Sequence, residues 1–100
     1  MNIVVLKLTS GEEVIGTEVE DNVNAGKITI GKARVLVMQQ APDGGIGLGM
    51  MPFMPSANDP ENGTESNVVI DKKQIMAVPE TVPKSLEDAY LRTTSNIQLV

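Results

Sequence analysis

The first twenty residues form an alternating pattern that predicts a β-hairpin and constrains what the rest of the chain can do. An apolar run at Ile3–Thr9 is followed by a turn centred on Ser10-Gly11 and by a second run at Glu13–Glu20. Gly16 lies inside the second run, where a glycine weakens a strand unless the chain bends there or another backbone comes close. We therefore expect a hairpin whose second strand, at Gly16, either curves sharply or lies close to another backbone.

The next strand is predicted to be long and to contain a bulge. Apolar side chains within Lys27–Gln40 occupy even positions up to Ile30 and odd positions from Ala33. Because successive side chains of a strand point to opposite faces, an extra residue near Gly31-Lys32 is needed to keep both sets on one side. A bent third strand of this kind can pass from one sheet to another.

The remainder of the chain predicts further strands and a helix, all within one domain of 100 residues. Leu86, Ala89 and Tyr90 have the i, i+3, i+4 spacing of an apolar helix face. The strand-rich part is expected at about 3–79, with a variable hairpin and polar loop at 41–66, and the helix at about 83–94. Within the strand-rich part, the later strands are expected at 46–54, 67–70 and 75–78, with a tight turn at 71–74.

The composition argues against an enzyme. The chain has no Cys and no His, which excludes disulfides, Cys/His zinc sites and the common nucleophile–base pairs. Asp59, Glu61 and Glu65 share one loop but lack the spacing of an EF-hand, so we expect no metal and no cofactor. Thirteen acidic and eight basic residues give a formal net charge of −5, so any contact with nucleic acid needs a local basic patch.

The sequence predicts a cytoplasmic location. Met1 leads directly into a strand, without the basic and apolar regions of a signal peptide. The longest apolar runs are far shorter than a membrane span, so we expect no membrane association.

Two separated motifs carry a resemblance to a known family. The spacing of the first Sm motif is met by Leu8, Gly11, Val14 and Gly16. Residues 28–33 resemble the end of that motif, and Val68–Val78 has the outline of the second. With strands between them, the two motifs make the chain similar to Sm-like (LSm) proteins. The Met-Pro-Phe-Met-Pro segment at Met51–Pro55 further resembles a small group of Sm-like proteins carried by tailed phages of marine cyanobacteria, which implies the cytoplasm of the host cell.

The resemblance implies both a fold and an assembly. The fold would be all-β, a small five-stranded, strongly bent SH3-like or Sm-like barrel with an extended hairpin between strands three and four and a short C-terminal helix. Subunits of this family pair strand four of one with strand five of the next, which implies a homo-oligomeric ring of about five to seven copies. The expected subunit interface is the last strand, Ile75, Met76, Ala77 and Val78.

The resemblance also implies binding of single-stranded RNA, or RNA-chaperone activity, through loops at the ring pore. The residues implied for this role are Asp21, Asn22, Asn24, Lys27, Lys72 and Lys73. The chain departs from the family at Asp71-Lys72, which stand where an Arg-Gly pair is usual. A carboxylate that only accepts hydrogen bonds there replaces a guanidinium with five donors, which weakens contacts with phosphates or bases.

A second interpretation keeps the oligomer but makes it a protein-interaction scaffold without an RNA role. The acidic net charge and the missing Arg-Gly pair favour it. The partner patch would consist of Met50, Met51, Phe53 and Met54, because flexible Met side chains adapt to different surfaces. The same segment could equally pack on its own subunit. Lys27, Lys32 and Arg34 form another basic cluster, which could balance acidic residues across the sheet at Glu12, Glu13, Glu18 and Glu20.

Overall fold

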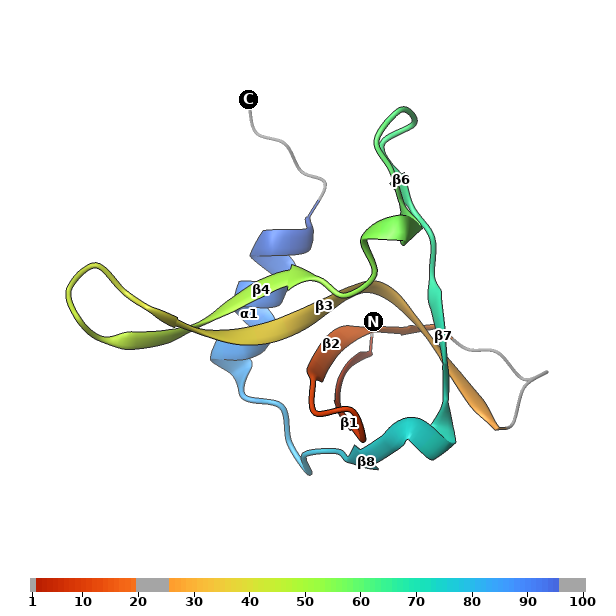
Figure 1. Ribbon diagram of the computed structural model, residues 1–100, viewed down its shortest axis with the longest axis horizontal. Helices are drawn as coiled ribbons and strands as arrows, with labels where there is room; N and C mark the ends of the chain where they lie inside the picture. The colour runs from red at the N-terminus through yellow and green to blue at the C-terminus, as the bar shows by residue number, and fades with distance from the viewer. Residues whose placement is uncertain (1, 20–25, 96–100) are drawn as a thin grey trace.

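The structure, a computed structural model, describes residues 2–19 and 26–95 (Figure 1). The strands are β1 (Ile3–Leu8), β2 (Glu13–Val19), β3 (Lys27–Gln40), β4 (Ile46–Pro52), β5 (Asn58–Asp59), β6 (Thr64–Glu65), β7 (Val68–Asp71) and β8 (Ile75–Ala77). The helical elements are the 3₁₀ turns η1 (Pro55–Ala57) and η2 (Lys72–Gln74) and the helix α1 (Lys84–Thr94). The predicted small, mostly β domain with a short helix near its C-terminal end is confirmed.

Six strands form one antiparallel sheet. Its order is β4-β3-β2-β1-β8, and β7 pairs with the first part of β3. β7 and β8 therefore end the sheet on opposite sides of the β3-β2-β1 centre, although only η2 separates them in the chain. The sheet must curve strongly for so short a connection to span its two ends, as Figure 1 shows around β1 and β2.

The predicted bulge in β3 is confirmed. Ile15 on β2 pairs with Arg34 and Thr17 pairs with Gly31, so two steps along β2 face three steps along β3. Lys32 lies inside this bulge with a φ of 50°, a backbone angle that side chains other than glycine seldom adopt.

The close packing of β2 and β3 beside the bulge explains why residue 16 is a glycine. A Cβ added there would lie 3.1 Å from the Cβ of Ile30 and 3.2 Å from the carbonyl oxygen of Gly31. The two strands approach too closely at this point for an ordinary side chain, which confirms the close backbone approach expected from the sequence.

The apolar side chains divide into two clusters by alternation along the strands. The first cluster centres on Leu6, Val14 and Ile30 and continues into β7. The second centres on Val5, Ile15 and Tyr90, so it joins the other face of β1 and β2 to α1. The following residues pack against the second cluster while partly buried: Ile3, Leu36, Met50, Val82 and Leu86.

The last part of the polar loop expected within 41–66 is more regular than a loop. It contains η1 and a small hairpin of β5 and β6. The Asp59 side chain accepts hydrogen bonds from the backbone N–H of Glu61 and from the Asn62 side-chain amide, at 3.1 and 2.7 Å. These bonds close the turn, and the backbone N–H of Ser66 donates to the Ala57 carbonyl at 2.8 Å, so polar residues here build a defined structure.

The hairpin of β3 and β4 extends beyond the body of the protein and is called the arm below (36–50; Figure 1). Leu36 lies opposite Met50, Met38 opposite Leu48, and Gln40 opposite Ile46, so all six side chains share one face. At the base of the arm this face packs on α1 through Leu36 and Met50. Toward the tip it is bare, with Met38, Leu48 and Ile46 exposed by 69, 55 and 71%.

Candidate nucleic-acid interface

The three lysines expected at the RNA site lie at one end of the β3–β7 pair. Lys27 starts β3 and lies opposite Asp71, the last residue of β7. The backbone N–H of Lys72 donates to the Gly26 carbonyl at 2.9 Å, which holds η2 beside the start of β3. Lys27, Lys72 and Lys73 are all exposed. The fold thus brings together charges that are 45 positions apart in the chain, as the numbering shows.

Asp71, next to these lysines, stabilises the turn η2. Its side chain accepts a hydrogen bond from the backbone N–H of Lys73 at 2.9 Å and so caps η2. The carboxylate stands beside the lysines, where it reduces the positive potential that they create. Asp21, Asn22 and Asn24, the other residues expected at this site, lie outside the described residues.

The expected subunit interface on β8 is largely uncovered. Ile75 packs against the first apolar cluster, whereas Met76 and Val78 are exposed by 62 and 60% and Ala77 is also exposed. β8 pairs with β1, and within residues 2–19 and 26–95 no strand pairs with its other edge. At the opposite end of the sheet, Val69 on β7 is exposed by 54%.

The four residues of the expected partner patch do not share one environment. Met50 packs against the second apolar cluster and Phe53 against the first, so both are partly buried within their own chain. Met51 and Met54 are exposed by 52 and 48%. A surface available to a partner would therefore be carried by Met51 and Met54, with Met50 and Phe53 anchoring the segment.

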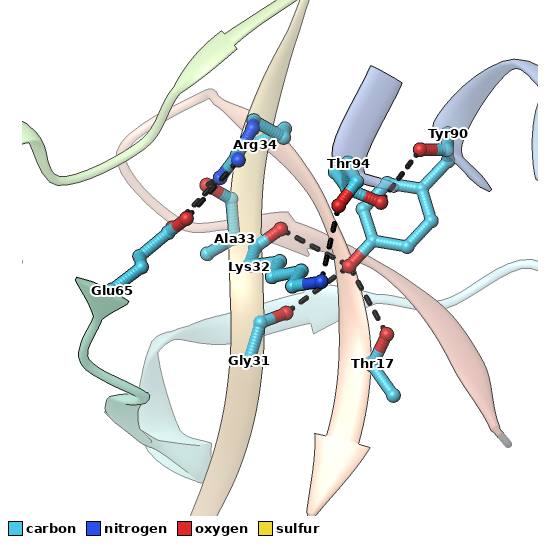
Figure 2. A network of polar contacts seen from close by, with 8 residues as sticks. All are labelled: Thr17, Gly31, Lys32, Ala33, Arg34, Glu65, Tyr90 and Thr94. Atoms are coloured by element: carbon cyan, nitrogen blue, oxygen red, sulfur yellow. Dashed lines mark hydrogen bonds and ion pairs between the residues drawn. The ribbon is translucent and has the colours of Figure 1, made fainter. Parts of the chain in front are cut away.

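A polar network at the bulge of β3 was not anticipated from the sequence (Figure 2). The Tyr90 hydroxyl lies 3.1 Å from the carbonyl oxygens of Gly31 and Lys32 and 3.1 Å from the Thr17 hydroxyl. The single phenolic proton is directed at the two carbonyls, so the Thr17 hydroxyl donates to the Tyr90 oxygen. Tyr90 itself is completely buried, and its burial raises the pKa of the phenol above the ordinary value.

The basic residues of the bulge are engaged elsewhere than expected. The Lys32 ammonium donates to the Thr94 carbonyl at the end of α1, at 3.0 Å, where a cation suits the negative end of the helix dipole. Arg34 forms a two-pronged ion pair with Glu65 on β6, at 2.7 and 3.1 Å. Among the described residues, Lys32 therefore contacts α1 and Arg34 contacts β6, and neither pairs with the acidic residues Glu12, Glu13 or Glu18 (Figure 2).

The network orders the fold and offers no reactive group. A cavity of about 500 Å³ lies beside it, bordered among others by Lys32, Arg34 and Thr93. A phenol whose pKa is raised stays neutral at physiological pH, and Arg34 is neutralised by Glu65. In the part of the chain that the structure describes, no three carboxylates lie close enough together to hold a metal ion. The period-3.6 pattern identified Tyr90 as an apolar helix position, but nothing local indicated its hydroxyl partners.

No helix among the described residues is long and apolar enough to cross a membrane.

No model of a protein family matches this sequence, and no match to a curated protein was found.

Proposed function

We propose that this chain is a subunit of an Sm-like ring that binds single-stranded RNA, with Lys27, Lys72 and Lys73 facing the RNA. No covalent chemistry is involved, and the protein would act as an RNA-binding or RNA-chaperone ring. The proposal combines the two Sm-like sequence motifs with the strand order and with the position of the three lysines.

The strand order is the observation that carries the proposal. Through its pairing with β3, β7 extends a series of neighbouring strands β7-β3-β2-β1-β8, and the 3₁₀ turn η2 joins its two end strands. This series supplies the five strands that the Sm-like resemblance implies for the barrel. The bulge of β3 and the close approach at Gly16 supply the bending that such a barrel requires. β4 to β6 would then be an insertion in the barrel, consistent with the variable region expected at 41–66.

Exposed apolar residues on the two end strands support ring assembly. Val69 on β7 and Met76 on β8 are more than half exposed, and no strand within the described residues covers either outer edge. Pairing of β7 of one subunit with β8 of the next would satisfy both edges and cover these side chains. Because the two edges differ, the contact is head-to-tail and closes into a ring if the rotation between subunits permits.

The lysine group supports contact with an RNA backbone more than readout of bases. Lysine side chains act as flexible point charges toward phosphates, whereas base recognition needs directional partners. Repetition of the three lysines around a ring would concentrate positive charge in a protein that is acidic as a whole. We therefore expect binding that depends strongly on salt and weakly on base identity.

Fluorescence polarisation with oligo-U and oligo-A RNA, over a salt series, tests this function. We expect saturable binding at low salt, and a loss of about tenfold or more in affinity for the Lys72→Glu/Lys73→Glu variant. The control is Lys84→Glu. Lys84 is an exposed lysine of α1 whose ammonium lies 3.4 Å from the Asp88 carboxylate. Equal binding by the lysine variant and the wild type would contradict the assignment of the site to these lysines. No binding at any salt concentration would contradict the RNA role itself.

An oligomeric protein-interaction scaffold without RNA is the second candidate. Exposure of Met51 and Met54 favours it, because neither side chain is needed for the core of its own subunit. In that case the ring would be retained while RNA affinity is absent. Light scattering that shows an oligomer, together with a negative polarisation experiment, would select this candidate.

A further inference from the structure

The arm has a free strand edge whose backbone groups can be assigned. In the β3–β4 pair, the Ala41 N–H donates to the Gly45 carbonyl and the Phe53 N–H donates to the Ala33 carbonyl, at 2.7 and 3.1 Å. Hydrogen-bonded pairs alternate along an antiparallel ladder, so odd-numbered residues of β4 bond to β3. The N–H and C=O groups of the even-numbered residues Ile46, Leu48 and Met50 therefore point outward.

Nothing in the sequence of β4 protects this edge. Natural edge strands usually carry charges, a central proline or a bulge that prevents pairing with another chain. β4 has no charged residue, and its proline is at the far end, Pro52. Within the described residues no strand pairs with the outer edge of β4.

The side chains of β4 are arranged symmetrically about Leu48. Ile46, Leu48 and Met50 occupy the apolar face of the arm, and Gly47 and Gly49 occupy the other. If two copies of β4 pair antiparallel about a twofold axis at Leu48, Ile46 of each copy faces Met50 of the other. The same axis places glycine opposite glycine, so neither face of the paired β4 strands contains a charge.

We infer that β4 is a self-association edge, at which the arms of two copies of this chain join antiparallel through Leu48 into a continuous sheet. The inference concerns a surface separate from β7 and β8, and it holds for a single subunit as well as for a ring. It does not depend on RNA binding.

A groove beside α1 fits this arrangement. It has a volume of about 280 Å³ and is lined by Leu48, Met50, Pro83, Ser85, Leu86 and Ala89. In the paired arrangement, Ile46 of the second copy lies next to Met50 on the face that carries the groove. The exposed Ile46 side chain, apolar and of suitable size, would then be covered by the groove of the other copy.

The other edge of the arm provides a contrast within the same hairpin. Beyond Val35, where the pairing with β2 ends, no strand among residues 2–19 and 26–95 pairs with the outer edge of β3. Pairing about Met38 on that edge would place Leu36 opposite Gln40 of the other copy, an apolar side chain against a polar one. Self-association is therefore expected on the β4 edge and not on the β3 edge.

The contact is small. A stable protein interface buries roughly 800 Å² on each partner, and a seven-residue strand edge with one groove provides less. Two isolated subunits would pair weakly, whereas rings that present several arms together would pair more tightly through multivalency.

Sedimentation velocity of the full-length protein over a concentration series tests the inference, with Leu48→Pro and Met38→Pro as a matched pair. Each proline removes one outward N–H and no β3–β4 hydrogen bond, from opposite edges of the same arm. We expect the wild type and Met38→Pro to form a species of twice the mass of the basic assembly, and Leu48→Pro to lose it. Far-UV circular dichroism of both variants checks that the domain stays folded.

Three results would overturn the inference: no doubled species in the wild type, a doubled species that survives in Leu48→Pro, or equal loss in both variants, which would indicate contact through the apolar face. Should either proline unfold the arm, Leu48→Lys and Met38→Lys give the same comparison, because a charge blocks strand pairing at an edge. A Met76→Lys variant tests the ring separately. If β8 forms the contact between subunits, this variant should lose the basic assembly itself.

Discussion

The two halves of β3 have similar apolar content and opposite surroundings. In the first half, Ile30 is completely buried between β2 and β7. In the second half, β4 is the only described strand beside Met38, which is exposed by 69%. The comparison teaches that the bulge at Gly31–Arg34 separates a part of the strand that stabilises the domain from a part whose apolar side chains are available for contact.

Truncation of one apolar side chain in each half provides the strongest test of this division. Ile30→Ala removes a fully buried side chain and leaves a cavity, so we expect a loss of about 2–5 kcal/mol in the free energy of unfolding. Met38→Ala should change it by no more than about 0.5 kcal/mol. Urea unfolding at low protein concentration measures both. Similar losses would show that the arm is part of the cooperative core.

Replacement of one glycine beside the buried half of β3 and one in the arm tests the same division at the level of the backbone. Gly16→Ala forces a Cβ against Ile30 and the Gly31 carbonyl, and we expect a loss of about 1–3 kcal/mol. Gly47→Ala in the arm meets no atom within 4 Å and should lie within about 0.5 kcal/mol of the wild type. Thermal unfolding of the two variants under one set of conditions checks the order. Tolerance of alanine at Gly16 would mean that the strands can separate there without a penalty.

Removal of the Tyr90 hydroxyl tests whether α1 holds the boundary between the two halves. Tyr90→Phe leaves the Gly31 and Lys32 carbonyls without this donor and should reduce the free energy of unfolding by about 1–2 kcal/mol. Thr17→Val, which removes the hydroxyl that donates to Tyr90, is the companion variant.

The pH dependence of the Tyr90→Phe effect follows from the pKa of the phenol. Burial raises the pKa of Tyr90 in the folded state above the value of about 10 expected in the unfolded chain. The neutral phenol thus contributes its full stability below pH 10, and the contribution falls as pH rises from 10 through the folded-state pKa, by at most ~1.4 kcal/mol per pH unit. The difference between wild type and Tyr90→Phe should be constant from pH 7 to 9 and shrink above pH 10, as measured by urea unfolding at each pH. A difference that grows with alkaline pH would contradict this assignment.

Local patterns were sufficient to predict most of the strands. Turn residues and alternation placed β1, β2 and β3, and the change of parity between Ile30 and Ala33 located the bulge. The helical spacing around Leu86 placed α1 to within one residue at its start. These features depend on neighbours in the chain, so a single sequence contains them.

Contacts between distant segments could not be predicted in the same way. The β5–β6 hairpin lies in a segment whose polar composition is typical of a loop, and Arg34, 31 positions away, holds Glu65 in place. The partners of the Tyr90 hydroxyl lie on β2 and β3, and no periodic pattern specifies such pairings. For the candidate site, the approach of Lys27 to Lys72 depends on the register of β3 with β7. The Sm-like resemblance implied only that the two loops share a site, and the residues alone did not determine this register.

The bulge of β3 also has a consequence for the order of events during synthesis. Its two carbonyls are held by Tyr90, and Lys32 is held by Thr94, both on α1. α1 follows every strand that the structure describes, so it leaves the ribosome after them. While the strands emerge and begin to pair, the bulge of β3 therefore lacks its contacts with α1. We expect a nascent chain stalled before residue 84 to hold this bulge less firmly than the complete domain does.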